Sequence, residues 1–572
     1  MKGRGLGITL GVFLFAASFM GLSPGGIEAA DKVQTGGTLV YLDTLPSYNA
    51  ISWDHYDWVW KHAYDTGFYM EHLLMGDLQK GPRGTNHYNF HPYDWIPPHL
   101  LRGELLESWE VKKNPLRLIL RLRKGVMWQE KTGVMKAREF VASDVVYSIS
   151  RLKNSRKAIP LFLDFVGKME MPDKYTVIIN MPEWCADWQY RIGWGYYDAI
   201  QAPEQEKAPG GAGKWQNACG TGPYMLTDYK EGHSQVYTKN PNYWDSEVID
   251  GQKFRLPFTD KVVMQLIKDE ATQIASLRTG KIDLMMNINW KHVDGLKKTN
   301  PQLQWSRFLF STNFTMAMRM DMKPFNDIRV RRAMNLAVNK QEIIDSFFGG
   351  NAEMHTYPFP SSYKDVYTPI NKLPPAAREL FTYNPEKARK LLAEAGYPNG
   401  FTIKAQISNN NPIQMDQATM VVAYLAKIGV TLILEPMDYP SWLARMNRKT
   451  HTEGIFFGNN FGPPFSGIRK NFVTGQTWNP HMMSDSHVDK TFTEANENPN
   501  LTEKQAFDLI KKLSVYVLEQ APCILLPTPY NYTAWWPWVK NYKGELRVGA
   551  HRGAPIIARI WIDQELKKKM GY

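Results

Sequence analysis

The sequence predicts an α/β protein with mixed sheets, because helix-like and strand-like segments alternate along most of the chain. In residues 270–286 an apolar helical period ends at a glycine and a strand-like run follows. The same order recurs in residues 384–408 and 420–438, and residues 501–526 lead from a helical pattern into an apolar strand. Glycine is a common helix stop, and repeated helix-to-strand order is typical of α/β folds.

The N-terminal half adds strands in hairpins. Residues 36–44 read as a glycine turn and a strand, and residues 105–123 alternate at period two around Asn114 and Pro115, which predicts a β-hairpin. A helix capped by Ser143 and Asp144 is expected next. Residues 203–214 are expected to form a flexible loop or linker, and two further strands should follow Cys219.

The N-terminus has the layout of a secretory signal peptide over residues 1–30. Lys2 and Arg4 precede an apolar run from Leu6 to Leu22, and small residues follow to Ala30. A membrane anchor is the alternative, although a run of this length is near the lower limit for a span. No cysteine lies there, so a lipid anchor on cysteine is not expected. We therefore expect an exported, periplasmic protein with two to four domains after cleavage.

Charge and cysteines exclude several classes of protein. The net charge is +12 for 572 residues, and the basic run at Arg329, Arg331 and Arg332 is interpreted as the solvated face of a helix. Nucleic acid is not expected as a partner of an exported protein. The three cysteines allow one disulfide, for which Cys185 and Cys219 are the expected pair, whereas Cys523 is expected to be a buried thiol.

Catalytic signatures are missing from the sequence. It contains no HExxH, no GxSxG, no phosphate-binding glycine loop and no GxGxxG after a strand, and no carboxylate pair stands out as that of a glycosidase. His87 and His91 are not on a credible helix, so neither a metal site nor a cofactor is expected. The unusual feature is 19 tryptophans, many of them in turn-rich segments, where aromatic residues line clefts about as often as they fill cores.

Five blocks of sequence, in order, resemble the large solute-binding proteins of ABC importers, of the dipeptide- and oligopeptide-binding type. These blocks lie in residues 105–154, 220–245, 325–344, 384–401 and 427–438. The resemblance implies a non-enzymatic, monomeric protein that traps a small molecule between lobes and delivers it to a membrane permease and its ATPase. Residues 77–103 look longer than the equivalent in simpler members.

The resemblance also implies a large three-lobe periplasmic binding fold of class II, the Venus-flytrap type, with two hinge crossovers. The expected division of the chain is lobe I at 31–60, 216–304 and 516–572, lobe II at 61–215, and lobe III at 305–515.

The resemblance places ligand contacts in the loop "FFGNNFGPP". Peptide-binding members carry a segment like "GWGADYPDP" there, whose first aspartate holds the α-ammonium group of the peptide. Asn460 stands at that position, Phe461 at the following tyrosine, and Asn459 precedes them. A buried ammonium group without a counter-charge is costly, so a neutral or anionic solute is favoured over an ordinary peptide. A shifted alignment would move the aspartate to Asp438.

Four further residues are expected at the cleft by the same resemblance, namely Trp53, Tyr56, Trp478 and Asn479. Two other functions stay open at this point. One is an exported binding protein that serves a sensor, and the other is a carbohydrate-active protein with a tryptophan-rich cleft.

Overall fold

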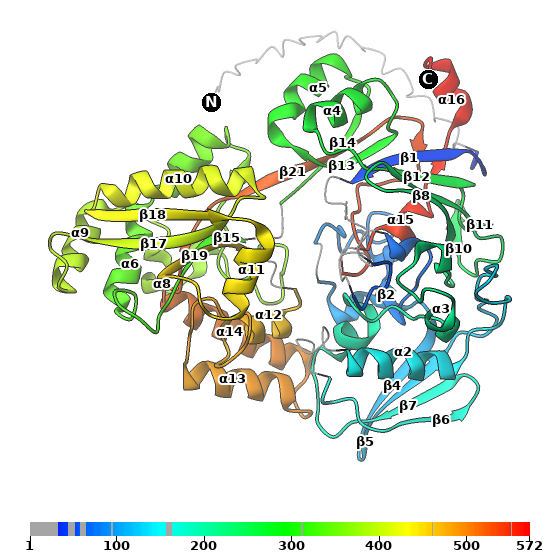
Figure 1. Cartoon of the computed structure of the whole chain (residues 1–572), viewed down its shortest axis with the longest axis horizontal. Coiled ribbons are helices and arrows are strands. Elements are labelled where there is room, and N and C mark those ends of the chain that lie inside the picture. Colours follow the sequence, from blue (N-terminus) through cyan, green and yellow to red (C-terminus); the bar gives the residue numbers. More distant parts are fainter. Residues whose placement is uncertain are drawn as a thin grey trace, which may run out of the picture.

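The computed structural model describes residues 32–43, 52–57, 65–92, 95–155, 163–309, 313–459, 462–550 and 552–572, so the predicted signal peptide lies outside the described residues. The described chain folds into three lobes, each built on its own sheet (Figure 1). Within these residues, no helix is both long and apolar enough to cross a membrane.

The first lobe contains an eight-stranded mixed sheet, at the top of Figure 1. In spatial order its strands are β14 (Gln304–Leu309), β21 (Thr528–Trp535), β13 (Leu284–Asn289), β1 (Thr38–Asp43), β12 (Lys261–Gln265), β9 (Ser234–Lys239) and β8 (Tyr224–Lys230), with β16 (Ala352–Glu353) also paired to β21. Strand β1 runs parallel to both β12 and β13, and the other pairs are antiparallel. The lobe is completed by α4 (Glu270–Arg278), α5 (Val293–Thr299), α15 (Ala554–Ile557), α16 (Gln564–Lys569) and the pairs β10 (Ser246–Ile249) with β11 (Gln252–Arg255) and β22 (Val539–Lys540) with β23 (Trp561–Ile562).

The second lobe is built on an antiparallel four-stranded sheet. Its strands, in spatial order, are β4 (Leu106–Lys113), β5 (Leu116–Leu122), β7 (Thr176–Asn180) and β6 (Met169–Asp173), joined by α2 (Ala142–Asn154), α3 (Pro203–Lys207) and the pair β2 (Leu74–Gly76) with β3 (Leu101–Gly103). The predicted hairpin is confirmed as β4 and β5. Helix α2 begins two residues earlier than predicted, and Asp144 caps it from its third position by accepting a hydrogen bond from the Val141 N–H at 3.0 Å.

The third lobe contains a five-stranded sheet, at the left of Figure 1. Its strands, in spatial order, are β18 (Val430–Met437), β17 (Phe401–Ser408), β19 (Gly454–Asn459), β15 (Asn313–Met318) and β20 (Cys523–Leu525). Strand β17 is parallel to β18 and β19. The helices are α6 (Ile328–Ala337), α7 (Lys340–Glu342), α8 (Pro375–Glu379), α9 (Pro385–Glu394), α10 (Pro412–Ala426), α11 (Tyr439–Asn447), α12 (Pro464–Phe472), α13 (Ser486–Glu497) and α14 (Glu503–Glu519).

Two connections link successive long strands of the first and third lobes, and the short strand β16, which lies between them in the chain, also pairs with β21 of the first lobe. One leads from β14 to β15 and the other from β20 to β21, and they correspond to the two predicted crossovers. Strands β14 and β16 pair in the first lobe although residues 305–515 were assigned to the third, and β20 pairs in the third although 516–572 was assigned to the first. A strand belongs to the sheet that pairs it, and pairing is not visible in a single sequence. The rest of the predicted division stays a prediction.

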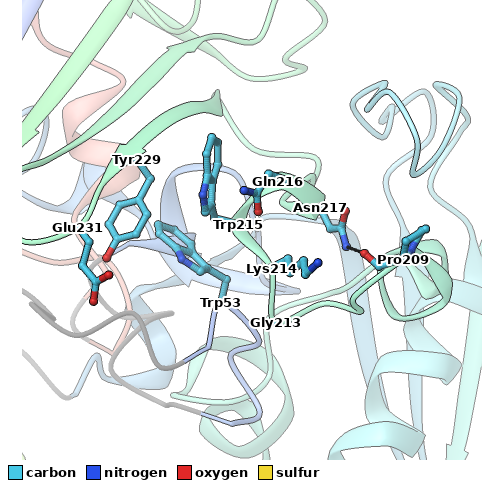
Figure 2. Close-up of a pocket in the computed structure, with 9 residues that line it drawn as sticks. All are labelled: Trp53, Pro209, Gly213, Lys214, Trp215, Gln216, Asn217, Tyr229 and Glu231. Carbon is cyan, nitrogen blue, oxygen red and sulfur yellow. Dashed lines mark hydrogen bonds between the residues drawn. The ribbon is translucent and has the colours of Figure 1, made fainter.

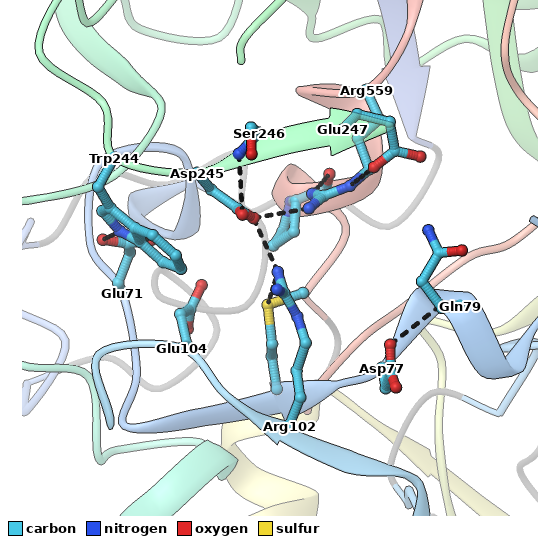
Figure 3. Close-up of polar contacts among 12 residues, drawn as sticks. Glu71, Asp77, Gln79, Arg102, Glu104, Trp244, Asp245, Ser246, Glu247 and Arg559 are labelled. Carbon is cyan, nitrogen blue, oxygen red and sulfur yellow. Dashed lines mark hydrogen bonds and ion pairs between the residues drawn. The ribbon is translucent and has the colours of Figure 1, made fainter. Parts of the chain in front are cut away.

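Ion pairs centred on the buried carboxylates of Asp245 and Glu247 join the first and second lobes (Figure 3). Arg102, on β3, contacts Asp245 at 2.7 Å, and Arg559 binds the same carboxylate at 2.6 Å. Arg559 also contacts Glu247 at 2.7 Å. Because these side chains come from both lobes and from the C-terminal segment, they tie the two lobes into one unit. The large hydrophobic core has the same effect, since it runs through both lobes and continues into α12, α13 and α14 of the third lobe.

The predicted disulfide is wrong for this structure, in which all three cysteines are free and buried. The Cys185 thiol donates to Asp187 at 3.3 Å, whereas the Cys219 sulfur lies 3.6 Å from the Met135 sulfur. The two cysteines therefore pack in separate surroundings and have separate partners. Cys523 is a buried thiol in β20, as predicted.

Two predictions about exposure are also wrong. Arg331 is buried rather than solvated, and it donates to the carbonyl groups of Phe325 at 2.7 Å and Gln520 at 2.9 Å. The segment 203–214 is not a free linker, because it begins with α3 and Arg138 contacts Glu204 there at 2.7 Å. In both cases a partner distant in sequence supplies the contact.

Candidate functional site

The candidate site lies where the carboxyl ends of parallel strands from two lobes face each other. In the first lobe β1 and β13 end at Asp43 and Asn289. In the third lobe the parallel strands β17, β18 and β19 end at one edge, and the start of β15 lies beside the end of β19. Ligands of α/β proteins bind in crevices outside the carboxyl ends of strands. This geometry therefore identifies the space between the two strand edges as the candidate ligand site.

A pocket of about 260 Å³ opens between these edges. Five amide side chains and one carboxylate supply most of its polar lining. The lining residues are Glu270, Gln273, Ile274, Met285, Asn287, Ile288, Asn289, Phe314, Asn411, Ile413, Pro529 and Asn531. Amides both donate and accept hydrogen bonds, so this lining suits a polar solute.

Two helices begin at this pocket. Asn411 caps α10 by accepting from the Gln414 N–H at 3.2 Å, and Glu270 is the first residue of α4. The N-terminus of a helix carries a partial positive charge, which favours oxygen-rich or anionic groups. The Glu270 carboxylate is already paired, with Lys291 at 2.6 Å and His292 at 3.1 Å. Glu270 therefore adds no uncompensated negative charge to the pocket.

A buried ion pair holds the strand edge of the first lobe in place. Asp43, at the end of β1, accepts from Arg547 at 2.6 Å and from the Asn287 amide at 2.8 Å. Asn287 has a φ of 60°, a left-handed conformation that asparagine tolerates better than most residues. The contact thus fixes one amide of the pocket against the neighbouring strand.

The described residues on either side of the loop after β19 contact two lobes. Asn460 and Phe461 lie outside the described residues, as does the side chain of Asn459, whose backbone pairs with Asn313. On the far side of the loop, Ser466 in α12 donates to Asp187 of the second lobe at 2.5 Å. The ligand contacts predicted at Asn459, Asn460 and Phe461 therefore stay predictions.

A charged cluster forms the junction between the second and third lobes. Asp187 contacts Arg191 at 2.5 Å, and Arg469 of α12 lies close enough to act on both charges. Burial alone would raise the pKa of Asp187, but Arg191 and Arg469 outweigh it and hold the pKa below its usual value. Burial and the like charge of Arg191 lower the pKa of Arg469 to about 9.

Apolar and backbone contacts extend this junction. Trp95, from the long segment 77–103, packs on Tyr363 with ring centroids 4.7 Å apart and on Phe507 at 5.8 Å. The Ala186 N–H donates to the Asn496 carbonyl at 3.0 Å. The second and third lobes are therefore in direct contact.

Two of the predicted residues, Trp53 and Tyr56, lie between the first and second lobes and do not line the smaller pocket. Trp53 lines a pocket of about 590 Å³ between the first and second lobes (Figure 2). Tyr56 is buried, donates to the Ser148 carbonyl at 2.9 Å and packs under the Arg151 guanidinium at 4.6 Å. The structure thus gives Tyr56 a place in the joint between these lobes.

Trp478 and Asn479 are held by their own lobe. Trp478 is half-buried and packs on the cluster around Trp442 and Phe457. The Asn479 amide donates to the Met483 carbonyl at 2.7 Å, and its oxygen accepts from the Met483 N–H at 3.1 Å. The structure does not bring these two side chains together with Trp53 in a pocket.

Truncation of Trp478 to alanine is therefore expected to act mainly on the third lobe. The free energy of unfolding should fall by about 1–3 kcal/mol because half-buried packing is lost, and solute affinity should change less than about threefold. Urea unfolding and calorimetric titration would measure both effects. A loss of affinity of tenfold or more with unchanged stability would instead make Trp478 a ligand contact.

Sequence reasoning missed several residues of the pocket between the first and third lobes and of the junction between the second and third lobes. Asp187 and Arg191 are four residues apart, a spacing that does favour an ion pair within a helical turn. Asn411 precedes a proline at the start of a helical pattern, which is a recognisable cap. No local signal indicated that Arg469 would lie beside Asp187 or that Asn287 would line the pocket.

Comparison with known proteins decides the family. The sequence model of the bacterial extracellular solute-binding proteins, family 5 (middle region), matches residues 101–476. The chain belongs to this family. This family 5 protein is the substrate-binding subunit of an ABC importer, which captures a small solute and delivers it to the membrane permease. Its relatives are periplasmic binding proteins rather than enzymes.

Individual relatives differ in what their names say they bind. Heme-binding protein A of Haemophilus influenzae is 29% identical over 461 residues, 77% of this chain and 81% of that protein. Di/tripeptide-binding protein 2 of Pseudomonas aeruginosa is 25% identical over 469 residues, 77% of this chain and 83% of that protein. The periplasmic binding protein DppA of Helicobacter pylori, solved with the peptide STSA, shares the fold with a TM-score of 0.72 at 22% identity, over 93% of this chain and 99% of that one.

Proposed function

We propose that this solute-binding protein captures a neutral polar or anionic solute, rather than a peptide with a free α-ammonium group. The solute binds between the strand edges of the first and third lobes, with Asn459, Asn460 and Phe461 among its contacts. The observation that carries this proposal is Asn460 at the position of the aspartate that peptide-binding members use. An amide cannot neutralise a buried ammonium group.

The described pocket supports the same preference. Its carboxylate, Glu270, is already paired with Lys291 and His292, so it is a poor anchor for a further cation. The remaining polar lining consists of amides, and two helix N-termini open on it. Such groups complement oxygen atoms and negative charge better than an ammonium ion.

The alternative aspartate has another role. Asp438 accepts a hydrogen bond from the Ser441 N–H at 3.0 Å and so caps α11 on an exposed surface. A side chain used as a helix cap is not aimed at a buried ligand. This favours the alignment that places Asn460 at the anchor position.

The names of the relatives do not identify the solute. One is a haem-binding protein and another a di/tripeptide-binding protein, at 29% and 25% identity. Ligand chemistry therefore varies among proteins about equally similar to this one, and the site itself has to decide. We further propose that the protein is a monomer without enzymatic activity and that residues 1–30 are a signal peptide removed on export.

An Asn460→Asp exchange is expected to weaken binding of the natural solute by about tenfold or more, because it adds a negative charge next to an uncharged or anionic ligand. Native mass spectrometry of freshly purified protein would identify the solute. Calorimetric titration would then compare the wild type with Asn460→Asp and with Asp438→Asn, a control that changes an exposed charge of the same lobe.

Dipeptides with free N-termini, such as dialanine, serve as the second probe. The wild type should not bind them below about 1 mM. Tighter binding of the natural solute by Asn460→Asp, or micromolar binding of dialanine by the wild type, would contradict the proposed ligand class.

A further inference from the structure

A second pocket, of about 590 Å³, lies apart from the site between the first and third lobes. Its lining residues are Trp53, Pro209, Gly213, Lys214, Trp215, Gln216, Asn217, Tyr229 and Glu231, none of which belongs to the third lobe or to the smaller pocket (Figure 2). Its volume is in the range of small-molecule sites. It is therefore large enough for a ligand of its own.

The sheet topology places this pocket at the same edge of the first-lobe sheet as the smaller pocket, but towards the other end of that edge. Strand β9 is antiparallel to β12, with Ser234 paired to Gln265, so the β8–β9 turn that carries Glu231 lies at the carboxyl end of β12. Strands β12 and β1 separate β9 from β13, which lines the smaller pocket. Three strand spacings amount to about 14 Å. The two pockets are thus separate sites on one edge.

Three aromatic rings form a braced wall. The Trp53 and Tyr229 rings meet edge to face with centroids 5.0 Å apart, and Trp215 meets Tyr229 at 6.5 Å. The backbone N–H of Trp53 donates to the Gly213 carbonyl at 2.9 Å. The Asn217 amide donates to the carbonyl groups of Pro209 and Gly211, which holds the segment 209–217 in shape. The wall is therefore formed before any ligand arrives.

The rim of the pocket is polar and balanced in charge. Lys214, Gln216 and Glu231 are exposed, and Figure 2 shows Glu231 on one side of the rings and Lys214 on the other. One positive and one negative side chain give no preference for an ion of either sign. A purely apolar ligand would gain nothing from the ammonium, amide and carboxylate groups.

We infer that this pocket binds a neutral sugar ring. The face of an aromatic ring is electron-rich and attracts the weakly positive C–H groups of a pyranose, while the rim side chains exchange hydrogen bonds with its hydroxyl groups. A sugar also carries no net charge, in agreement with the balanced rim. This inference is independent of the solute proposed for the other pocket.

Saturation-transfer NMR tests it with four probes, namely glucose, galactose, mannose and N-acetylglucosamine, each at up to about 10 mM. At least one sugar should receive saturation on its ring protons. Trp215→Ala should weaken this binding by about tenfold or more, and Gln216→Ala, an exposed site that leaves the wall intact, by about threefold. Trp305→Ala is the matched control, since Trp305 is a half-buried tryptophan on β14 at the far end of the sheet.

Three results would overturn the inference. The first is no transfer to any of the four sugars, and the second is binding that survives both Trp215→Ala and Gln216→Ala. The third is saturation of the pocket by free L-tryptophan in preference to sugars, which would make it a site for aromatic rings. Asn460→Asp should leave sugar binding unchanged, so failure of this inference and failure of the proposed solute class are distinguishable.

Discussion

Replacement of Asp187 by asparagine is expected to lower the free energy of unfolding by about 3–5 kcal/mol and to separate the second and third lobes. Asp187 is the buried carboxylate between two arginines, Arg191 from its own lobe and Arg469 from the third. Without its charge the two guanidinium groups repel each other in a region of low polarity. Removal of one partner from a buried charge cluster is costly for this reason.

Two measurements would separate these effects. Urea unfolding followed by tryptophan fluorescence gives the loss of stability, and small-angle X-ray scattering gives the increase in radius of gyration when the lobes part. Asp508→Asn is the matched control, because Asp508 lies on an exposed surface and pairs with Lys504 at 2.7 Å. Such a surface pair contributes about 0–1 kcal/mol. Equal effects of the two exchanges would show that the junction does not hold the lobes together.

The contribution of Asp187 should also depend on pH in a defined direction. Its pKa is held below the usual value in the folded protein. Its stabilising effect is therefore present above the unfolded pKa and is lost as pH falls through the folded value. The difference between wild type and Asp187→Asn should accordingly shrink in acid.

The wild type is expected to lose stability between about pH 5 and pH 8, and replacement of Glu71 by glutamine is expected to remove the share of that loss that Glu71 causes. Glu71 is fully buried and accepts hydrogen bonds from Tyr243 at 3.1 Å and Trp244 at 3.0 Å. Burial and the nearby Glu104 raise the pKa of Glu71 to about 8 (Figure 3). The folded protein then holds a proton that the unfolded chain has already released.

The sign of the pH dependence follows from that proton. A carboxyl group with a raised pKa makes the folded state less stable as pH rises from the unfolded value to the folded one. Each pKa unit corresponds to about 1.4 kcal/mol, so the effect is on the order of several kcal/mol. Urea unfolding of both proteins from pH 5 to pH 9 would measure it, with Glu110→Gln as an exposed control. Parallel curves for wild type and Glu71→Gln would contradict the prediction.

Much of the fold was predictable because its signals are local. The hairpin of β4 and β5, helix α4 with the strand after it, and the pairs α9 with β17 and α10 with β18 all follow from periodicity and a stop residue within about 25 positions. Cap positions were displaced by one or two residues. Helix α2, for example, begins at Ala142 rather than after Ser143.

The candidate site was predictable only in part. The resemblance indicated the loop with Asn459, Asn460 and Phe461, and these ligand contacts stay a prediction because Asn460, Phe461 and the side chain of Asn459 lie outside the described residues. The amide-lined pocket was not predicted, because its residues come from α4, β13, β15, α10 and β21, which no sequence pattern places together.

The sequence by itself determined the fold class, the order of helices and strands, and the resemblance to solute-binding proteins, because short-range spacing carries each of these. Only the tertiary structure decided that Cys185 and Cys219 stay apart, that Arg331 is buried, and that Ser466 meets Asp187 across 279 residues. The physical reason is the same in all three cases. A side chain's partner depends on which distant segments pack against it, and that packing is a property of the folded chain as a whole.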